Sequence, residues 1–158
     1  MRFGTRTVVG RRWTKEGYRP TCQMKYGYKY NYLYQATQPY TGKTFEMFLP
    51  RMDGECFELF LQEFAKQHPK ACLIMDNAGS HKKEIENQEA KKVKIEFLAP
   101  YSPDFNPQER MFQEIKTVIK GKFFEDIEDI EKIVEQKVKQ LSQNPEKVKS
   151  LTAWHWII

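Results

Sequence analysis

The stretch from Leu73 to His81 reads Leu-Ile-Met-Asp-Asn-Ala-Gly-Ser-His. With Ala71 and Cys72 before it, its apolar start is short enough to be a buried β-strand. Asp76 stands at the carboxyl end of that strand, and Gly79 supplies a turn. Ligands of such sheets gather at the carboxyl ends of strands, so Asp76 is a candidate functional carboxylate. The alternative is that Asp76 only caps the following turn.

A second stretch, residues 97–110, reads Phe-Leu-Ala-Pro-Tyr-Ser-Pro-Asp-Phe-Asn-Pro-Gln-Glu-Arg. It is a proline-rich loop that leads into a predicted helix over 107–123, with Glu109 in the first turn. Asn106 and Pro107 are typical of a helix cap and first position, so Glu109 can be a capping glutamate alone. Asp76 and Glu109 can also meet from separate elements as ligands of a divalent cation.

The remaining pattern predicts an α/β fold. A basic hairpin arm is expected from Thr5 to Trp13, followed by a turn at 15–17. Alternating tyrosines predict a strand from residue 28, and Thr44–Leu49 predicts its antiparallel partner. Helices are expected over 53–67 and 127–141, a short solvated helix over 82–92, and a further strand over 93–98. This order predicts a mixed sheet with helices packed on it.

Composition narrows the possible functions. The 158 residues suit one domain, and the net charge of +5 favours a polyanionic partner, nucleic acid first, although lysines spread over solvated faces are an equal explanation. Three widely spaced cysteines give no zinc or disulfide pattern and fit a reducing cytoplasm. Cys72, in its apolar run, is expected to pack as a small hydrophobic residue. No apolar run reaches the length of a membrane span.

The two motifs together carry a family resemblance. Asp76-Asn-Ala-Gly-Ser-His81 followed by Pro100-Tyr-Ser-Pro-Asp-Phe-Asn-Pro-Gln-Glu109 resembles the IS630 branch of the IS630/Tc1/mariner transposases. The Arg2-Phe3-Gly4 start, the segment Trp13 to Pro20 and Leu49-Pro50-Arg51 also look like that family. The resemblance covers essentially the whole chain.

The resemblance implies a DDE/D active site on a ribonuclease-H-like fold, with two Mg²⁺ (or Mn²⁺) ions. Asp76 matches the second acid and Glu109 the third. Asn77, His81 and Asn106 match supporting positions. His81 is expected to contact DNA or brace the metal site, unless it only satisfies nearby backbone. Asp104 is a weaker rival of Glu109 as the third acid.

The chain departs from the family pattern at its start. In the family, the first catalytic Asp stands in an Asp-Glu-x-Arg-Phe-Gly motif, and here Met1 occupies the x. We therefore expect residues 1–158 to be the C-terminal portion of a DDE catalytic domain. The helix-turn-helix region and the first core strand with its Asp would be absent. Such a chain is expected to be poorly active alone.

The functional expectation follows from the resemblance. The intact enzyme would cleave DNA at a transposon end and join the freed 3′-hydroxyl to target DNA, as a homo-oligomer in a prokaryotic cytoplasm at the nucleoid. Six basic residues near the start of the chain are expected to contact DNA phosphates: Arg2, Arg6, Arg11, Arg12, Lys15 and Arg19. An equal explanation is that they only solvate an exposed hairpin. The alternative function is a non-catalytic DNA-binding remnant, or a fragment that completes a transposase in trans.

Overall fold

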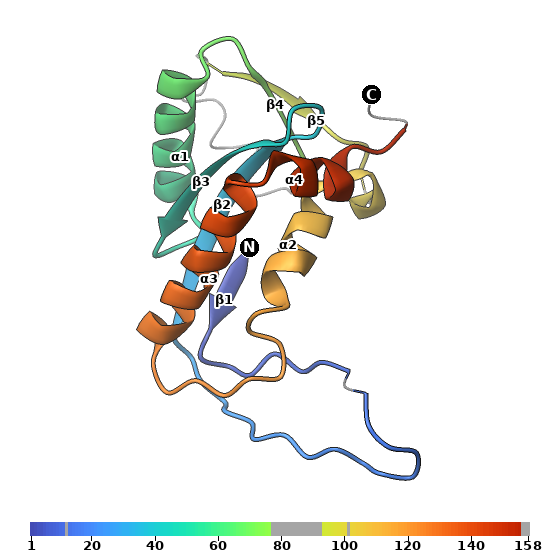
Figure 1. Cartoon of the computed structure of the whole chain (residues 1–158). Helices are drawn as coiled ribbons and strands as arrows, with labels where there is room; N and C mark the ends of the chain where they lie inside the picture. Colours follow the sequence, from blue (N-terminus) through green and yellow to red (C-terminus); the bar gives the residue numbers. More distant parts are fainter. Residues whose placement is uncertain (12, 77–92, 101, 156–158) are drawn as a thin grey trace.

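The computed structural model describes residues 1–11, 13–76, 93–100 and 102–155 (Figure 1). The strands are β1 (Arg2–Gly4), β2 (Tyr30–Gln38), β3 (Lys43–Leu49), β4 (Cys72–Met75) and β5 (Lys94–Phe97). The helices are α1 (Gly54–Gln67), the 3₁₀ helix η2 (Pro103–Phe105), α2 (Gln108–Lys116), α3 (Ile127–Ser142) and α4 (Pro145–Thr152).

Several predicted elements occur where the sequence placed them. The helix expected over 53–67 is α1, and the Asp53 side chain caps it by accepting from Cys56 N–H at 3.0 Å. The helix expected over 127–141 is α3. The helix expected over 107–123 ends early, at Lys116, and turns follow it. The solvated helix expected over 82–92 lies outside the described residues.

Three strands form an antiparallel sheet in the order β1-β2-β3. Phe3 pairs with Asn31, and Ala36 pairs with Phe45. The turn between β2 and β3 closes with a bond from Gly42 N–H to the Gln38 carbonyl at 2.8 Å. Gly42 has a φ of +73°, a conformation that glycine adopts without steric cost. The basic segment expected to form a hairpin contains no regular strand after Gly4 and before Tyr30 among the described residues.

One hydrophobic core lies between α1 and both sheets. Phe57, Phe60 and Phe64 stand on one face of α1 and are buried. They pack with Phe45 of β3 and also with apolar side chains of β2, β4 and β5, which are Tyr34, Ala36, Leu73, Met75 and Ile95. The ring of Phe60 lies 5.3 Å from that of Phe45 and 5.6 Å from that of Tyr34. Helix α1 thus bridges two sheets that share no hydrogen-bonded strand pair among the described residues.

A second core covers the opposite face of the three-stranded sheet. Leu33 and its register partner Phe48 point to that face, because successive side chains alternate along a strand. They pack with the buried residues of α2, α3 and α4, which include Met111, Ile115, Val134 and Val148. The Lys137 ammonium bonds Glu114 at 2.7 Å, which ties α3 to α2 and lowers the pKa of the Glu114 carboxyl.

The strand predicted over 71–75 forms, but the prediction that it is buried is wrong. Leu73 and Met75 face the α1 core, whereas Cys72 is exposed and Ile74 is 62% exposed. Strand β4 pairs in parallel with β5 in a separate two-stranded sheet. Among the described residues only one face of β4 packs against a helix, and the two side chains on its other face are exposed.

The bridging role of α1 gives a stability prediction. Phe60 is 3% exposed, and Phe60→Ala should lower the free energy of unfolding by about 3–5 kcal/mol, because it empties the centre of this core. Equilibrium urea unfolding followed by circular dichroism measures the change. Leu59→Ala, one residue away on the exposed side of α1, is the matched control and should cost less than about 1 kcal/mol. Similar losses for the two variants would contradict this packing.

Candidate active site

A cleft of about 1080 Å³ lies between β2 and β4. Residues 32–38 line one side of it and residues 71–76 line the other. Side chains of α1 and α2 complete the walls, among them Phe60, Phe64 and Phe112. We call it the central cleft. Its volume slightly exceeds the ~300–1,000 Å³ of ordinary small-molecule pockets.

The β2 side of the central cleft is an open strand edge. The pairing of β1 with β2 reaches only to Met1 and Leu33, which exchange bonds through both of their backbone polar groups. In an antiparallel ladder every second residue points its N–H and C=O to the same neighbour. Gln35 and Thr37 therefore direct these groups to the side that Leu33 uses, and no described strand pairs with them there.

The β4 side is open in the same way. The Met75 carbonyl accepts from Leu98 N–H at 2.8 Å on the β5 side. By the same alternation, Cys72 and Ile74 direct their backbone polar groups away from β5. Both open edges thus line one cleft. Unpaired strand edges are normally covered or paired in proteins, because their polar groups need partners.

Asp76 and Glu109 both line this cleft. Asp76 follows the last residue of β4, and Glu109 lies in the first turn of α2. Both carboxylates are exposed, and they are the two acidic residues among the described residues that line the cleft. Asn106 orients the start of α2, since its Oδ1 accepts from Gln108 N–H at 3.0 Å. The Gln108 side chain also donates to Gln35 Oε1 at 2.8 Å, which ties α2 to β2.

The amino group of Met1 lies in the same cleft, which sequence reasoning did not predict. It donates to the Leu33 carbonyl at 2.5 Å. Its pKa is lowered from 8.0 to about 6, chiefly by burial and also by the Lys116 charge, while the Glu109 charge acts in the opposite direction. These effects arise from residues 1, 33, 109 and 116, which only the folded chain brings together.

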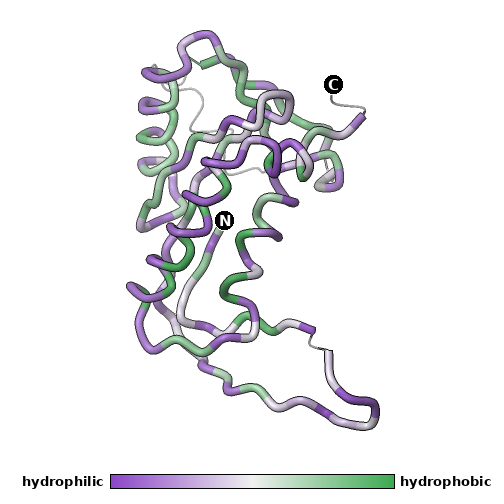
Figure 2. Tube along the Cα trace, in the orientation of Figure 1, coloured by the Kyte–Doolittle hydropathy of each residue, from purple (hydrophilic) through white to green (hydrophobic). Residues whose placement is uncertain are grey.

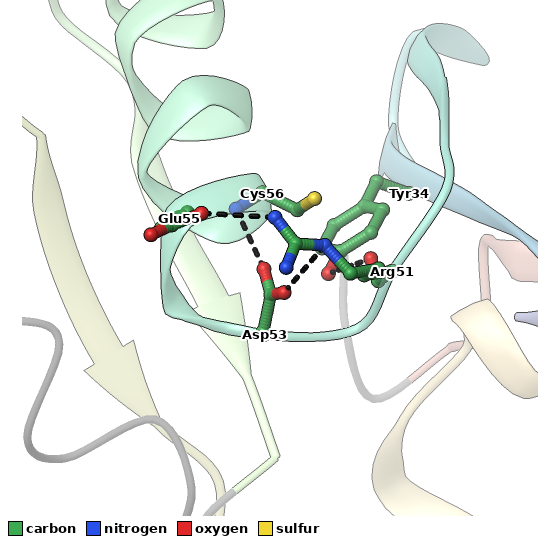
Figure 3. A network of polar contacts seen from close by, with 5 residues as sticks. All are labelled: Tyr34, Arg51, Asp53, Glu55 and Cys56. Carbon is green, nitrogen blue, oxygen red and sulfur yellow. Dashed lines mark hydrogen bonds and ion pairs between the residues drawn. The ribbon is translucent and has the colours of Figure 1, made fainter.

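Other candidate acids are placed elsewhere. Asp104 is exposed on η2 and does not line the central cleft. Asp53 is held by Arg51, whose Nε lies 3.0 Å from Asp53 Oδ2, and by the Cys56 N–H, which lowers the pKa of the Asp53 carboxyl (Figure 3). Arg51 also pairs with Glu55 at 2.9 Å. Asp53 therefore serves the start of α1.

The basic candidates divide into two groups. Arg2 lies on β1, with its guanidinium 4.7 Å from the centroid of the Tyr30 ring. Arg6, Arg11, Lys15 and Arg19 are exposed on the segment between β1 and β2, which projects away from the sheets (Figure 1). Asn77, His81 and Arg12 lie outside the described residues.

The donor set suits a hard divalent cation in part. Two exposed carboxylates at one cleft are oxygen ligands of the kind that Mg²⁺ and Mn²⁺ prefer. Within the described residues, no cluster of three or more His, Cys, Asp or Glu side chains is placed to hold a metal ion. Asp76 and Glu109 could thus serve as two ligands, and a site for two ions would need at least one further bridging group.

Comparison with protein-family models identifies the family of this chain. The family model described as DDE superfamily endonuclease matches residues 1–131. The chain belongs to the DDE superfamily endonuclease family. A curated relative of this DDE endonuclease chain is the uncharacterized protein y4pE/y4sA of Sinorhizobium fredii, 28% identical over 132 residues, which cover 79% of the chain and 95% of the relative.

Solved structures show the fold of the DDE endonuclease chain. The Mos1 strand transfer complex matches with a TM-score of 0.61 at 14% identity, over 98% of this chain and 53% of that chain. The Mos1 paired-end complex with the left transposon end matches with a TM-score of 0.57 at 14% identity, over 98% and 54%. These likenesses confirm the predicted ribonuclease-H-like α/β fold. The chain spans about half the length of the Mos1 chains.

The described part of the DDE endonuclease chain also contains no helix with the length and apolar character of a membrane span. This agrees with the lack of a long apolar run in the sequence.

The Met1 amine gives a pH prediction for a chain that begins at this residue. The folded state holds the amine proton more weakly than the unfolded chain, so full stability is present above pH 8.0 and is lost as the pH falls to about 6. Two pKa units correspond to roughly 2–3 kcal/mol of unfolding free energy. Urea unfolding between pH 5.5 and 8.5 in EDTA measures this.

N-terminal acetylation is the matched control, because it removes the titrating group and leaves every other one in place. The difference in unfolding free energy between the two proteins should change over this window. A constant difference would show that the amine is not buried in the central cleft.

Proposed function

We propose that this chain is the C-terminal portion of the catalytic domain of an IS630-like transposase, acting in metal-dependent DNA cleavage and strand transfer. The observation that carries the proposal is that Asp76 and Glu109 both line the central cleft. The family match and the Mos1-like fold support it. The Mos1 structures are complexes with transposon DNA or of strand transfer, which supports DNA as the partner.

Asp76 and Glu109 would hold the divalent metal, Mg²⁺ or Mn²⁺. Such ions, when bound, activate the attacking oxygen and stabilise the leaving oxygen of a phosphodiester. The protein contributes position: β4 fixes the backbone of Asp76, and the Asn106 and Gln108 contacts fix the first turn of α2 under Glu109. In this proposal Asn77 and His81 support the site, and Arg2 contacts DNA.

The central cleft also supports the proposal that a core strand belongs between β2 and β4. The start of β4 lies near the Ala36 end of β2, because His68 packs on Phe45, the register partner of Ala36. Asp76, at the other end of β4, lines the cleft together with Met1. A backward extension of β1 would therefore run antiparallel to β2 and parallel to β4. It would carry a third acid to the metal site, and the chain without it would be poorly active.

The open cleft favours one alternative function, a fragment that completes a transposase in trans. A non-catalytic DNA-binding remnant is the other. In either case we propose that the chain acts at a prokaryotic nucleoid and that the intact transposase is a homo-oligomer. Metal binding separates a surviving site from a remnant, since a remnant needs no ion to bind DNA.

The first test of the proposed function is Mn²⁺ binding, measured by electron paramagnetic resonance or calorimetry. Asp76→Ala and Glu109→Ala should each weaken Mn²⁺ binding by tenfold or more, because each removes one of two carboxylate ligands. Asp104→Ala, an exposed acid outside the cleft, is the control and should bind as the parent chain does. Equal Mn²⁺ affinity in all four proteins would sink the proposed metal site.

The second test extends the chain at Met1 with six mainly apolar β-branched residues that end in Asp-Glu. The added strand should slow amide hydrogen exchange at Gln35, Thr37, Cys72 and Ile74 by at least tenfold, because their backbone groups gain partners. An extension with proline at every second position cannot form this ladder and is the matched control. Unchanged exchange with the first extension would contradict the proposed core strand.

A further inference from the structure

Positive charge is concentrated in one segment of the chain. Residues 5–29, which we call the arm, contain seven basic residues and one acid, Glu16. The arm therefore has a net charge of +6 against +5 for the whole chain, and the rest of the molecule is close to neutral. The basic residues of the arm are Arg6, Arg11, Arg12, Lys15, Arg19, Lys25 and Lys29.

The base of the arm is fixed to the domain. Thr5 N–H donates to the Lys29 carbonyl at 3.1 Å, and Thr7 exchanges bonds with Lys25 at 3.1 and 2.9 Å. Gly121 N–H, after α2, donates to the Val8 carbonyl at 2.7 Å. Beyond these contacts the arm projects from the domain to a turn that Tyr18 N–H closes on the Lys15 carbonyl (Figure 1).

Four aromatic rings of the arm face solvent. Trp13 is fully exposed, and Tyr18, Tyr26 and Tyr28 are 65%, 70% and 86% exposed. Each ring is next to a cation in the sequence, in the pairs Arg12-Trp13, Tyr18-Arg19, Lys25-Tyr26 and Tyr28-Lys29. The tube coloured by hydropathy shows apolar and polar residues intermixed along the arm (Figure 2). Large exposed rings mark interaction sites when they gather on one element.

We propose that the arm binds unpaired nucleotides of a DNA strand, with its cations on phosphates and its rings stacked on bases. Grooves that bind single-stranded nucleic acid combine these two features. Paired bases stack on one another and offer few free faces, so duplex binding would use the cations and leave the rings idle. Interface cores are depleted of lysine, and two of the four rings have a lysine beside them in the sequence. A protein interface is therefore the less favoured occupant, and it is one outcome of the test.

The arm proposal deepens the proposed function, because it names the form of DNA that the chain engages. It does not depend on the metal site, so its test is run in EDTA. A failure of Mn²⁺ binding and a failure of single-strand binding are then separate results.

The experiment compares a fluorescent oligothymidine with a duplex of equal length, by anisotropy at several salt concentrations. The double variant Trp13→Ala/Tyr18→Ala should weaken single-strand binding by tenfold or more and duplex binding by less than twofold, with the salt slope unchanged. Arg11→Gln/Lys15→Gln should weaken binding to both and reduce the salt slope. Tyr40→Ala, an exposed tyrosine outside the arm, is the control.

Three outcomes overturn the proposal. The first is an equal loss of single-strand and duplex affinity in the aromatic variant, which would give the rings no stacking role. The second is unchanged affinity for both. The third is a parent chain that is dimeric by light scattering and becomes monomeric in the aromatic variant with unchanged DNA affinity, which would make the rings a protein interface.

Discussion

The packing of the α1 phenylalanines against two separate sheets is the interaction on which the remaining architecture depends. The three-stranded sheet and the β4-β5 sheet share no strand pair among the described residues, so backbone hydrogen bonds do not set their relative position. Phe57, Phe60 and Phe64 do this, because their common core includes side chains from β2, β3, β4 and β5. The position of Asp76 relative to Glu109 therefore depends on apolar packing some distance from either carboxylate.

Glu109 is held by different means. It stands on α2, which packs with α3 and α4 on the other face of the sheet and bonds β2 through Gln108 and Gln35. The two carboxylates thus come from different layers of the fold and line the same cleft. A cation that joins them would also join the two layers, and ligand binding of this kind stabilises the folded state in proportion to its affinity.

Local signals in the sequence predicted the elements that local chemistry determines. Asp53 before an apolar stripe gave the start of α1, and Asn106-Pro107 gave the start of α2. The sequence predicts a longer α2 than the structure has, because Ile119 continues its apolar stripe. The helix ends at Lys116, and Ile119 is buried in the turns that follow. The apolar run at 71–75 predicted a strand but not its exposure, because burial of Cys72 and Ile74 requires a neighbour that periodicity cannot supply. The contact of Met1 with Leu33 and Glu109 depends on residues far apart in the chain and left no local signal.

The same cleft accounts for three observations that would otherwise be unrelated. The backbone groups of Gln35 and Thr37 lack a partner strand on one side, Ile74 exposes an apolar side chain, and the Met1 amine is buried at a cost that lowers its pKa. An unpaired strand edge, an exposed apolar side chain and a buried ionisable amine are each unfavourable. A strand between β2 and β4, as proposed above, would give partners to both open edges at once, which a ligand bound at one edge would not.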